Sequence, residues 1–390
     1  MNTNPQQPLI AAYYFPNFHV DVRNERVHGT GWTEWEVLKQ SRPRFENHRA
    51  PFRPVWGYED EADPEVMANK IRYAKKHGVD AFIFDWYYYD DGDFLNGCLE
   101  NGYMKAAGSE DHLFALMWAN HDWRDIAPAK LSQSNDILHQ GKVTEVTMLR
   151  MADVVASRYF SQENYLRIDG CPYFSIYELC NLIEQAGGLE QAAEQLQKFR
   201  ERVREVSSQQ VHLNGVVFRA PILPGERVPM KVADLIAGLG LDSITSYVWT
   251  HYCPQLNEVP FFPYTQARDQ YLEAWRGYVR DFDVPCFPNV TVGWDPSPRT
   301  LASDTWEMRR YPFSGVMTGN TPELFGDAIS TCLKEYSQTE SFQMLTINAW
   351  NEWTEGSYLE PDDFYGYAYL EAIAKAKTEF VSALSQNTAQ

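Results

Sequence analysis

The segment PEVMANKIRYAKKHGVDAFIFDWYY (residues 64–88) contains a complete helix-and-strand unit. Its first half, residues 64–77, places apolar residues at helical spacing and is followed by Gly78, a residue type that commonly ends a helix. Its second half, residues 80–88, is a run of apolar and aromatic residues with the length of a buried strand. A helix that leads directly into a buried strand is typical of α/β proteins with a parallel sheet.

The same alternation extends in both directions along the chain. Strands are predicted at residues 9–15, 80–88, 113–120, 173–179, 215–220, 243–249, 287–294 and 344–353. Helices are predicted at residues 64–77, 144–159, 189–206, 232–239, 265–281, 322–336 and 365–384. Eight strands, most of them followed by a helix, predict a (β/α)8 TIM barrel with loop insertions at its C-terminal face.

We predict one domain over residues 1–390, with a core at about 9–384 and insertions at 21–61 and 254–263. A doubly wound open sheet is the alternative architecture. That fold usually has a glycine-rich phosphate turn after its first strand, where this chain has Phe15-Pro16-Asn17-Phe18.

The composition is acidic and rich in aromatic residues. A net charge of −19, from 53 Asp and Glu against 34 Lys and Arg, disfavours nucleic acid and anionic membranes as partners. The 12 Trp and 23 Tyr favour apolar platforms that suit sugar rings. Six scattered Cys without a CxxC pair predict free thiols and no metal site, and we expect no cofactor. Residues 1–10 lack a signal-peptide pattern and no run of 18 apolar residues occurs, so we expect a cytoplasmic protein.

The active site of such a barrel lies at the carboxyl ends of its strands. Seven of the eight predicted strands end in an aromatic residue beside a carboxylate, amide or imidazole. One such end can be a capped, partly buried aromatic residue, but recurrence at seven ends predicts a carbohydrate groove. The substrate-binding residues predicted from these positions are Tyr14, His19, Asp85, Trp86, Trp118, Asn120, Tyr247, His251, Trp294, Asp295, Trp350 and Asn351.

The eighth predicted strand carries the candidate catalytic pair. Alternation puts every second residue from Thr346 to Glu352 on one face, which we expect to point to the barrel mouth. Glu355 follows three residues later. Two carboxyl groups beside tryptophans suit glycosidic cleavage, because burial and a neighbouring carboxylate raise the pKa of the group that must be protonated. A surface acidic turn is the alternative interpretation in a chain with 53 acidic residues.

The chain resembles the WbsX-like, glycoside hydrolase family 99-like proteins in six segments. They are AAYYFPNFH (11–19), GTGWTEWEVLKQSRPRF (29–45), HGVDAFIFDWYYYDDG (77–92), LFALMWANHDW (113–123), NAWNEWTEGSYLEPD (348–362) and YGYAYLEA (365–372). Family 99 itself, the endo-acting α-mannosidases, has a strand-eight motif of the form NEWHEG. Residues 351–356 match that motif except for Thr354, which stands where His is often found.

This resemblance implies a TIM barrel and retaining cleavage without a metal. It implies that Glu352 acts as a base on the 2-hydroxyl of the sugar, whose oxygen attacks the anomeric carbon to give a 1,2-anhydro intermediate. Glu355 would act as general acid and then as general base. Because the match to family 99 is thin outside the motif, neither mannoside specificity nor endo action follows from it.

The leading hypothesis is a glycoside hydrolase that cleaves an α-linked glycan, either mannoside-like or a bacterial surface polysaccharide. The second is a WbsX-type glycosyltransferase of polysaccharide biosynthesis, although the sequence has neither a phosphate loop nor a basic cluster for a nucleotide sugar. The third is a non-catalytic carbohydrate-binding barrel. The expected partner is an oligo- or polysaccharide in all three.

Overall fold

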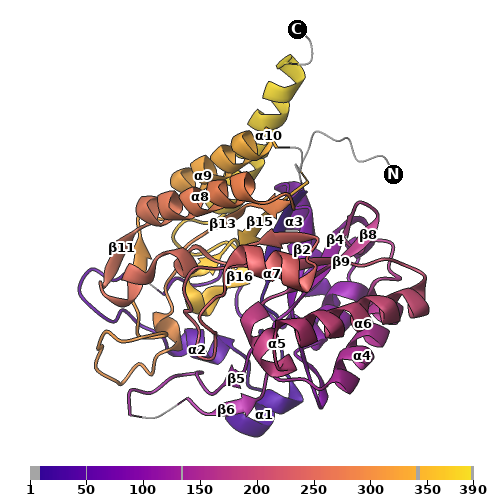
Figure 1. Ribbon diagram of the computed structural model, residues 1–390. Helices are drawn as coiled ribbons and strands as arrows, with labels where there is room; N and C mark the ends of the chain where they lie inside the picture. The colour runs from indigo at the N-terminus through magenta and orange to yellow at the C-terminus, as the bar shows by residue number, and fades with distance from the viewer. Residues whose placement is uncertain (1–8, 50, 133–134, 340–342, 388–390) are drawn as a thin grey trace.

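The computed structural model describes residues 9–49, 51–132, 135–339 and 343–387. Its centre is a ring of parallel strands (Figure 1). In order around the ring these are β1 (Leu9–Tyr14), β2 (Ala81–Tyr89), β4 (Leu113–Trp118), β8 (Cys171–Ile176), β9 (His212–Val216), β10 (Ser243–Thr245), β12 (Cys286–Phe287) with β13 (Asn289–Thr291), and β15 (Met344–Asn348). Parallel pairing of β15 with β1 closes the ring. The predicted (β/α)8 TIM barrel is therefore confirmed.

The seventh position of the barrel holds two short strands. β12 pairs with β10, whereas β13 pairs with β15. Pro288 lies between them and has no N–H to donate to a ladder, but its carbonyl accepts a hydrogen bond from Thr346 N at 2.9 Å. The single strand predicted over residues 287–294 is split at this proline for that reason.

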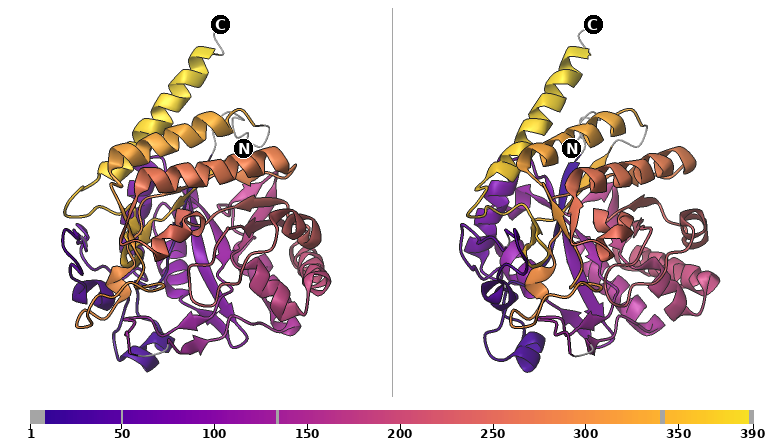
Figure 2. Two further views of the ribbon diagram at one scale, coloured as in Figure 1. Left: turned by 60° about the vertical axis from the view of Figure 1, so that its left-hand side comes forward. Right: turned by 90° about the vertical axis from the view of Figure 1, so that its left-hand side faces the viewer.

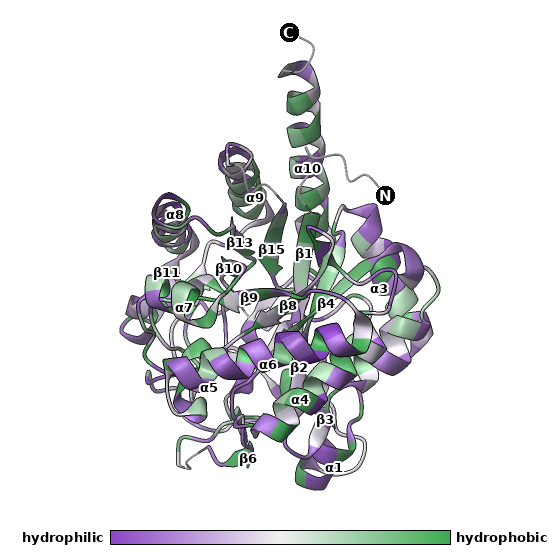
Figure 3. Ribbon diagram, turned by 45° about the vertical axis from the view of Figure 1, so that its right-hand side comes forward, coloured by the Kyte–Doolittle hydropathy of each residue, from purple (hydrophilic) through white to green (hydrophobic). Residues whose placement is uncertain are grey.

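Helices surround the barrel (Figures 1 and 2). The longer ones are α3 (Pro64–Lys76), α4 (Glu145–Val154), α5 (Leu179–Ala186), α6 (Leu189–Ser207), α7 (Val232–Leu239), α8 (Tyr264–Asp281), α9 (Pro322–Tyr336) and α10 (Ala368–Asn387). α3 begins where the Asp63 carboxylate caps Glu65 N, and it ends before Gly78, whose φ of 82° favours glycine. α6 buries its apolar stripe and turns its hydrophilic side outward (Figure 3).

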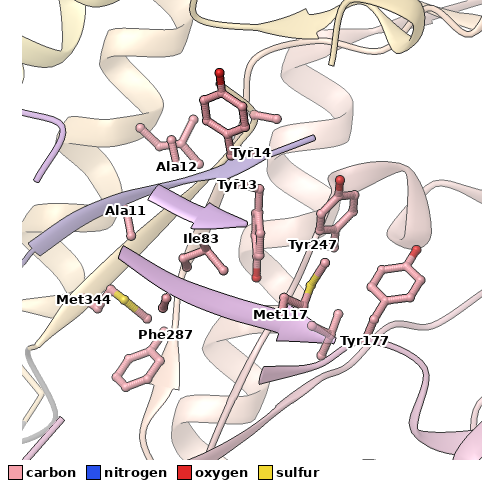
Figure 4. Close-up of a cluster of buried hydrophobic side chains, with 14 of the residues drawn as sticks. Ala11, Ala12, Tyr13, Tyr14, Ile83, Met117, Tyr177, Tyr247, Phe287 and Met344 are labelled. Atoms are coloured by element: carbon pink, nitrogen blue, oxygen red, sulfur yellow. The ribbon is translucent and has the colours of Figure 1, made fainter. Parts of the chain in front are cut away.

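The side chains of each barrel strand alternate between the interior and the helix layer. On β1, Tyr13 and Tyr14 point in opposite directions (Figure 4). Tyr13 lies inside, with its ring centroid 4.7 Å from that of Tyr247, whereas the Tyr14 hydroxyl contacts Met67 of α3. On β2, Asp85 points inward to Tyr247, while Trp86 packs outward against the ring of Tyr159. This alternation decides which strand-end residues can reach the barrel mouth.

Loops at the carboxyl ends of the strands cover the mouth. The expected insertion at residues 21–61 contains α1 (Val22–His28) and α2 (Trp35–Gln40), and that at 254–263 contains β11 (Phe261–Pro263). A hairpin of β5 (Trp123–Arg124) and β6 (Ile137–His139) and a long segment after β13 add to this cover and were not predicted. α1, α2, β5 and β6 gather at the lower end of the barrel in Figure 1.

Several predicted strand boundaries are wrong. The strands predicted at residues 243–249 and 344–353 end earlier, at Thr245 and Asn348. The strand predicted at residues 173–179 ends at Ile176, because Glu178 caps α5, which begins at Leu179. The strand predicted at residues 215–220 is β9, which begins earlier, at His212. Across the described part of the chain, the helices are too short or too polar to cross a membrane.

Candidate active site

A pocket opens at the carboxyl ends of the barrel strands. The strands contribute side chains at or just after the ends of β2, β4, β8, β10 and β15, and the loops supply the rest. The lining residues are Phe15, His28, Trp32, Glu34, Asp85, Tyr87, Met117, Ala119, His121, Asp122, Trp123, Arg124, Ile126, Ala127, Tyr177, Leu223, Pro224, Tyr247, Arg299, Tyr311, Glu352 and Glu355. The aromatic side chains give apolar walls, and the carboxyl groups converge between them.

Glu352 and Glu355 enter this pocket from a small hairpin. β16 (Asn351–Glu352) pairs antiparallel with β17 (Ser357–Tyr358), and a single 3-10 turn, η8 (Trp353–Glu355), joins them. Gly356 ends that turn with a φ of 64°. A Cβ there would lie 2.7 Å from Asp295 Cβ and 2.9 Å from Asp295 N, so both the backbone conformation and the available space require glycine.

Arg299 is the arginine that lies among Glu34, Glu352 and Glu355 in the pocket. It ends η7 (Ser297–Arg299) in the long segment after β13, and its side chain is only 9% exposed. Its Nη2 lies 3.4 Å from Glu352 Oε2 and 3.8 Å from Glu355 Oε1. Because both oxygens lie near one nitrogen, they are no more than about 7 Å apart. That limit includes the carboxyl separation of retaining glycosidases, ~5–5.5 Å, and only the lower end of the range for inverting ones, ~6.5–9.5 Å.

The first insertion delivers a third glutamate to the same arginine. Glu34 Oε1 lies 3.7 Å from Arg299 Nη2 and accepts a hydrogen bond from Thr354 Oγ1 at 2.9 Å. Its other oxygen accepts from Asn17 Nδ2 at 2.7 Å. Arg299 Nε also donates to Thr354 Oγ1, at 3.0 Å. Thr354, the position at which the motif departs from family 99, therefore links the insertion to the hairpin that carries Glu352 and Glu355.

The two candidate catalytic glutamates have different hydrogen-bond partners. Tyr311 donates to Glu355 Oε1 at 2.6 Å. The Tyr247 hydroxyl lies 3.1 Å from Glu352 Oε1 and 2.9 Å from Asp85 Oδ2. Both glutamates are thus bonded to a tyrosine. Tyr247, the partner of Glu352, is also bonded to a second carboxyl group, that of Asp85.

Burial raises the pKa of the pocket's carboxyl groups. Desolvation is the largest cause for Glu352, whose pKa lies well above its usual value, and the charge of Glu355 raises it further. Desolvation also raises the pKa of Glu355, against the lowering effects of Arg299 and of the hydrogen bond from Tyr311. Asp85 has a strongly raised pKa for the same reason. Burial of this kind favours the protonated form of a carboxyl group, which is the form that an acid catalyst needs.

Four of the residues predicted from strand ends line this pocket: Asp85, Tyr247, Glu352 and Glu355. Two more, Trp294 and Asp295, line a neighbouring cavity behind the hairpin, where Asp295 Oδ2 lies 2.8 Å from His48 Nε2. Their position at the end of the seventh predicted strand placed these two in the same groove. Their side chains instead lie on the other side of the turn η8.

The predicted aromatic residues Tyr14, Trp86 and Trp118 lie outside both cavities, in the layer between the strands and helices. Their side chains point away from the barrel interior, because side chains alternate along each strand. Trp118 Nε1, for example, donates to Tyr88 O. Trp350 also lies in this layer, with its ring 4.8 Å from that of Phe82 and its Nε1 donating to Glu360 at 2.9 Å. β15 ends at Asn348, so the predicted alternation does not continue to residue 350.

The remaining predicted groove residues hold loops in place behind the lining. Asn351 bonds both backbone groups of Phe15 at 2.8 Å and so ties the hairpin to β1. Asn120 bonds the backbone of Glu178, and His251 Nε2 lies 3.1 Å from Glu226 Oε1. His19 is buried, with a pKa lowered by desolvation. The two asparagines are satisfied internally in this way, whereas His19 Nδ1 and His251 Nδ1 are buried without a hydrogen-bond partner among the described residues.

Arg299, Tyr311 and Tyr87 line the pocket but were not predicted from the sequence. Tyr87 could have been found, since it follows Asp85 by two residues and shares its inward phase. Arg299 and Tyr311 lie in a long loop without a periodic pattern. In the described part of the chain, no group of three or more His, Cys, Asp or Glu residues is arranged to hold a metal ion.

Comparison with known proteins gives a family and a fold. Residues 10–373 match the family model described as "Glycosyltransferase WbsX". Proteins named "Uncharacterized protein WxcX" from two strains of Xanthomonas campestris pv. campestris are 27% identical in an alignment over 387 residues that covers 95% of this chain and 49% of theirs. The chain therefore spans about half the length of the curated relatives it matches.

Solved structures share the barrel. The GH99 endo-α-mannosidase from Bacteroides thetaiotaomicron superposes with a TM-score of 0.55 at 14% identity, covering 98% of this chain and 100% of that chain. A protein described as glycoside hydrolase-like superposes with a TM-score of 0.58 at 14% identity, covering 95% and 94% of the two chains. At this level of identity the likeness concerns the fold, so the chemistry must be argued from the pocket itself.

Proposed function

The chain belongs to the WbsX family, and within that family we propose that it is a glycoside hydrolase with Glu352 and Glu355 as its catalytic pair. The observation that carries this proposal is the placement of both glutamates, buried and within 4 Å of Arg299 Nη2, at the mouth of the barrel. Two carboxyl groups with raised pKa values between aromatic walls suit the protonation and charge stabilisation of glycosidic cleavage.

The contacts of the two glutamates suggest different roles. Glu352 receives donors on both oxygens, Tyr247 on Oε1 and Arg299 on Oε2, and this arrangement stabilises the ionised form of a base. The contacts of Glu355 with Tyr311 and Arg299 are both made through Oε1. Its Oε2 is then the atom that carries the proton of a general acid.

The reaction we propose is retaining and passes through a 1,2-anhydro sugar. Glu352 removes the proton of the 2-hydroxyl, the freed oxygen forms a bond to the anomeric carbon, and the leaving glycosidic oxygen takes the proton of Glu355. Glu355 then accepts a proton from water as the water oxygen attacks the anomeric carbon. The three-membered ring opens, and Glu352 returns its proton to the 2-oxygen, which restores both side chains.

The substrate we propose is a largely neutral, α-linked glycan, either mannoside-like or from a bacterial surface polysaccharide. The pocket is lined by five carboxyl groups, Glu34, Asp85, Asp122, Glu352 and Glu355, against two arginines. Even with the general acid Glu355 and one further carboxyl group protonated, three carboxylates face two arginines, and this excess disfavours anionic sugars next to the catalytic pair. Flat side chains such as Trp32 and Trp123 at the pocket walls offer stacking surfaces for sugar rings.

A second candidate, a glycosyltransferase, is favoured by the description of the family model. A nucleotide-sugar donor would bring a pyrophosphate group into the pocket, where the excess of carboxyl groups would repel it. We therefore rank this activity second. It predicts that a nucleotide sugar raises the melting temperature of the protein, because a ligand that binds only the folded state stabilises it.

The test compares the wild type with Glu352→Gln and Glu355→Gln on α-mannan, rhamnose-containing and other bacterial surface glycans, with products identified by mass spectrometry. Glu36→Gln is the matched control, because Glu36 is a partly exposed acid on α2 that pairs with Lys39. The wild type and the control should release new reducing ends, and the two active-site variants should not. Full activity in both active-site variants would refute the assignment, and a stabilising nucleotide sugar without any cleavage would favour the transferase.

A further inference from the structure

We propose that Asp85 is a protonated positioning residue that donates its proton to the Tyr247 oxygen, so that Tyr247 donates to Glu352 and keeps that glutamate ionised. The role extends the function proposed above and rests on it, because it concerns the protonation state of the base Glu352. The three side chains come from β2, from the segment after β10 and from β16.

The argument begins with a count of protons. The Tyr247 oxygen lies 2.9 Å from Asp85 Oδ2 and 3.1 Å from Glu352 Oε1, and both distances are those of hydrogen bonds. A phenol has one proton to donate. Two hydrogen bonds through one hydroxyl oxygen therefore need a second proton, which one of the two carboxyl groups must provide. The phenol keeps its own proton, because burial and the two nearby acids raise the pKa of Tyr247 well above its usual value.

The surroundings place this second proton on Asp85. Glu352 has Arg299 3.4 Å from Oε2, whereas the ion pairs of Arg299 reach Glu34, Glu352 and Glu355 but not Asp85. Asp85 Oδ1 is buried and has no hydrogen-bond partner among the described residues. If Asp85 were ionised, this oxygen would be charged, desolvated and unpaired. If Asp85 is protonated, the oxygen is that of a neutral carbonyl group, and burying it without a partner costs less free energy.

The other groups around Asp85 act in the same direction. Its pKa is raised mainly by burial and also by the charge of Glu355, against the lowering effect of the hydrogen bond with Tyr247. Glu352 interacts with Asp85 as well, since the charge of an ionised Asp85 would raise the pKa of Glu352 and the two carboxyl groups therefore disfavour being ionised together. The other titratable side chains that interact with Asp85 electrostatically are phenols whose pKa values are raised well above their usual value, Tyr13 of β1, Tyr87 of β2 and Tyr177 after β8. None of these phenols supplies a positive charge that would favour the ionised form of Asp85.

The decisive variant is Asp85→Asn, because an asparagine amide imitates a protonated carboxyl group in both shape and charge. Its NH2 group can donate to the Tyr247 oxygen. If Asp85 is neutral, Asp85→Asn removes no charge, and the acid limb of kcat/KM, which follows ionisation of Glu352, keeps its midpoint. If Asp85 is ionised instead, the variant removes a neighbouring negative charge and moves that limb to lower pH by about one unit or more, which would overturn the proposal.

Asp85→Ala provides the comparison, because it deletes the donor to Tyr247. We expect its kcat/KM to fall at least about tenfold below that of Asp85→Asn, the ratio that corresponds to one hydrogen bond. Equal losses in the two variants would show that donation to Tyr247 is unimportant. Thermal unfolding of both variants checks that they are folded.

An infrared measurement tests the proton directly and does not depend on any activity. The difference spectrum between the wild type and Asp85→Asn at neutral pH should contain the carbonyl band of a protonated carboxyl group, and Glu352→Gln should retain that band. A band that survives in Asp85→Asn and disappears in Glu352→Gln would place the proton on Glu352 and refute the proposal. If no glycan is cleaved, the function proposed above fails while this result still decides where the proton lies.

Discussion

Replacement of Arg299 by Met should show how much this side chain stabilises the fold by neutralising the charges of the buried glutamates. Its guanidinium lies within 4 Å of Glu352, Glu34 and Glu355, and its side chain is 9% exposed. Removal of one partner of a buried ion pair costs about 3–5 kcal/mol, because a buried charge is left uncompensated. We therefore expect Arg299→Met to lose about 3–5 kcal/mol of unfolding free energy under conditions in which the glutamates would be ionised.

The size of this loss should depend on pH. Arg299 lowers the pKa of Glu352 and of Glu355, so its removal raises both pKa values in the folded protein further above their values in the unfolded chain. A folded-state pKa that is raised contributes stability below the unfolded pKa, and this stability is lost as the pH rises through the folded pKa. The deficit of the variant should therefore be largest at high pH and shrink as the pH falls.

Urea unfolding of the wild type and the variant over a range of pH measures this deficit. Arg158→Met is the matched control, because Arg158 also pairs with two acids, Asp93 and Glu100, but its side chain is 43% exposed. A surface pair of this kind contributes about 0–1 kcal/mol. If Arg299→Met cost no more than Arg158→Met, or if its deficit did not change with pH, Arg299 would not be neutralising buried charge and the electrostatic account of the pocket would be wrong.

Three further substitutions test other parts of the site. Tyr311→Phe removes the hydrogen bond that lowers the pKa of Glu355, so the alkaline limb of kcat/KM, which follows loss of the acid's proton, should move up by about one unit in a pH–rate profile. Gly356→Ala forces a Cβ against Asp295 at a φ of 64° and should cost about 1–3 kcal/mol in urea unfolding. Lys70→Met, outside the pocket, leaves the buried Glu61 and Glu360 without their shared cation and should cost about 3–5 kcal/mol in the same assay.

The barrel and the position of the two glutamates near the end of its last strand were predictable because their signals are local. Apolar runs of strand length and helical periodicity repeat along the chain, and the motif at residues 351–356 lies directly after the last strand. It was harder to predict which side chains of each strand face the barrel interior. Aromatic residues occupy both faces of β1 and β2, so Tyr13 and Tyr14, or Asp85 and Trp86, cannot be assigned to the interior or to the helix layer from hydropathy alone.

The loop contributions to the site could not be predicted in this way. Arg299 and Tyr311 reach Glu352 and Glu355 from the long segment after β13, across sequence separations of 53 and 44 residues. Glu34 reaches the same place across 320 residues, through its bond with Thr354. Such positions depend on how long loops fold over the barrel, and no local pattern encodes that arrangement.

The roles of Glu352 and Glu355 illustrate what the structure adds to the motif. The motif contains two glutamates three residues apart, and both have raised pKa values because both are buried. The contacts then distinguish them, since Glu352 has a donor at each oxygen, whereas the contacts of Glu355 converge on Oε1. A carboxylate with both oxygens stabilised is suited to remove a proton, and one with a free oxygen is suited to deliver one. This asymmetry predicts that Glu355→Gln, but not Glu352→Gln, keeps measurable cleavage of an aryl glycoside whose leaving group needs no protonation.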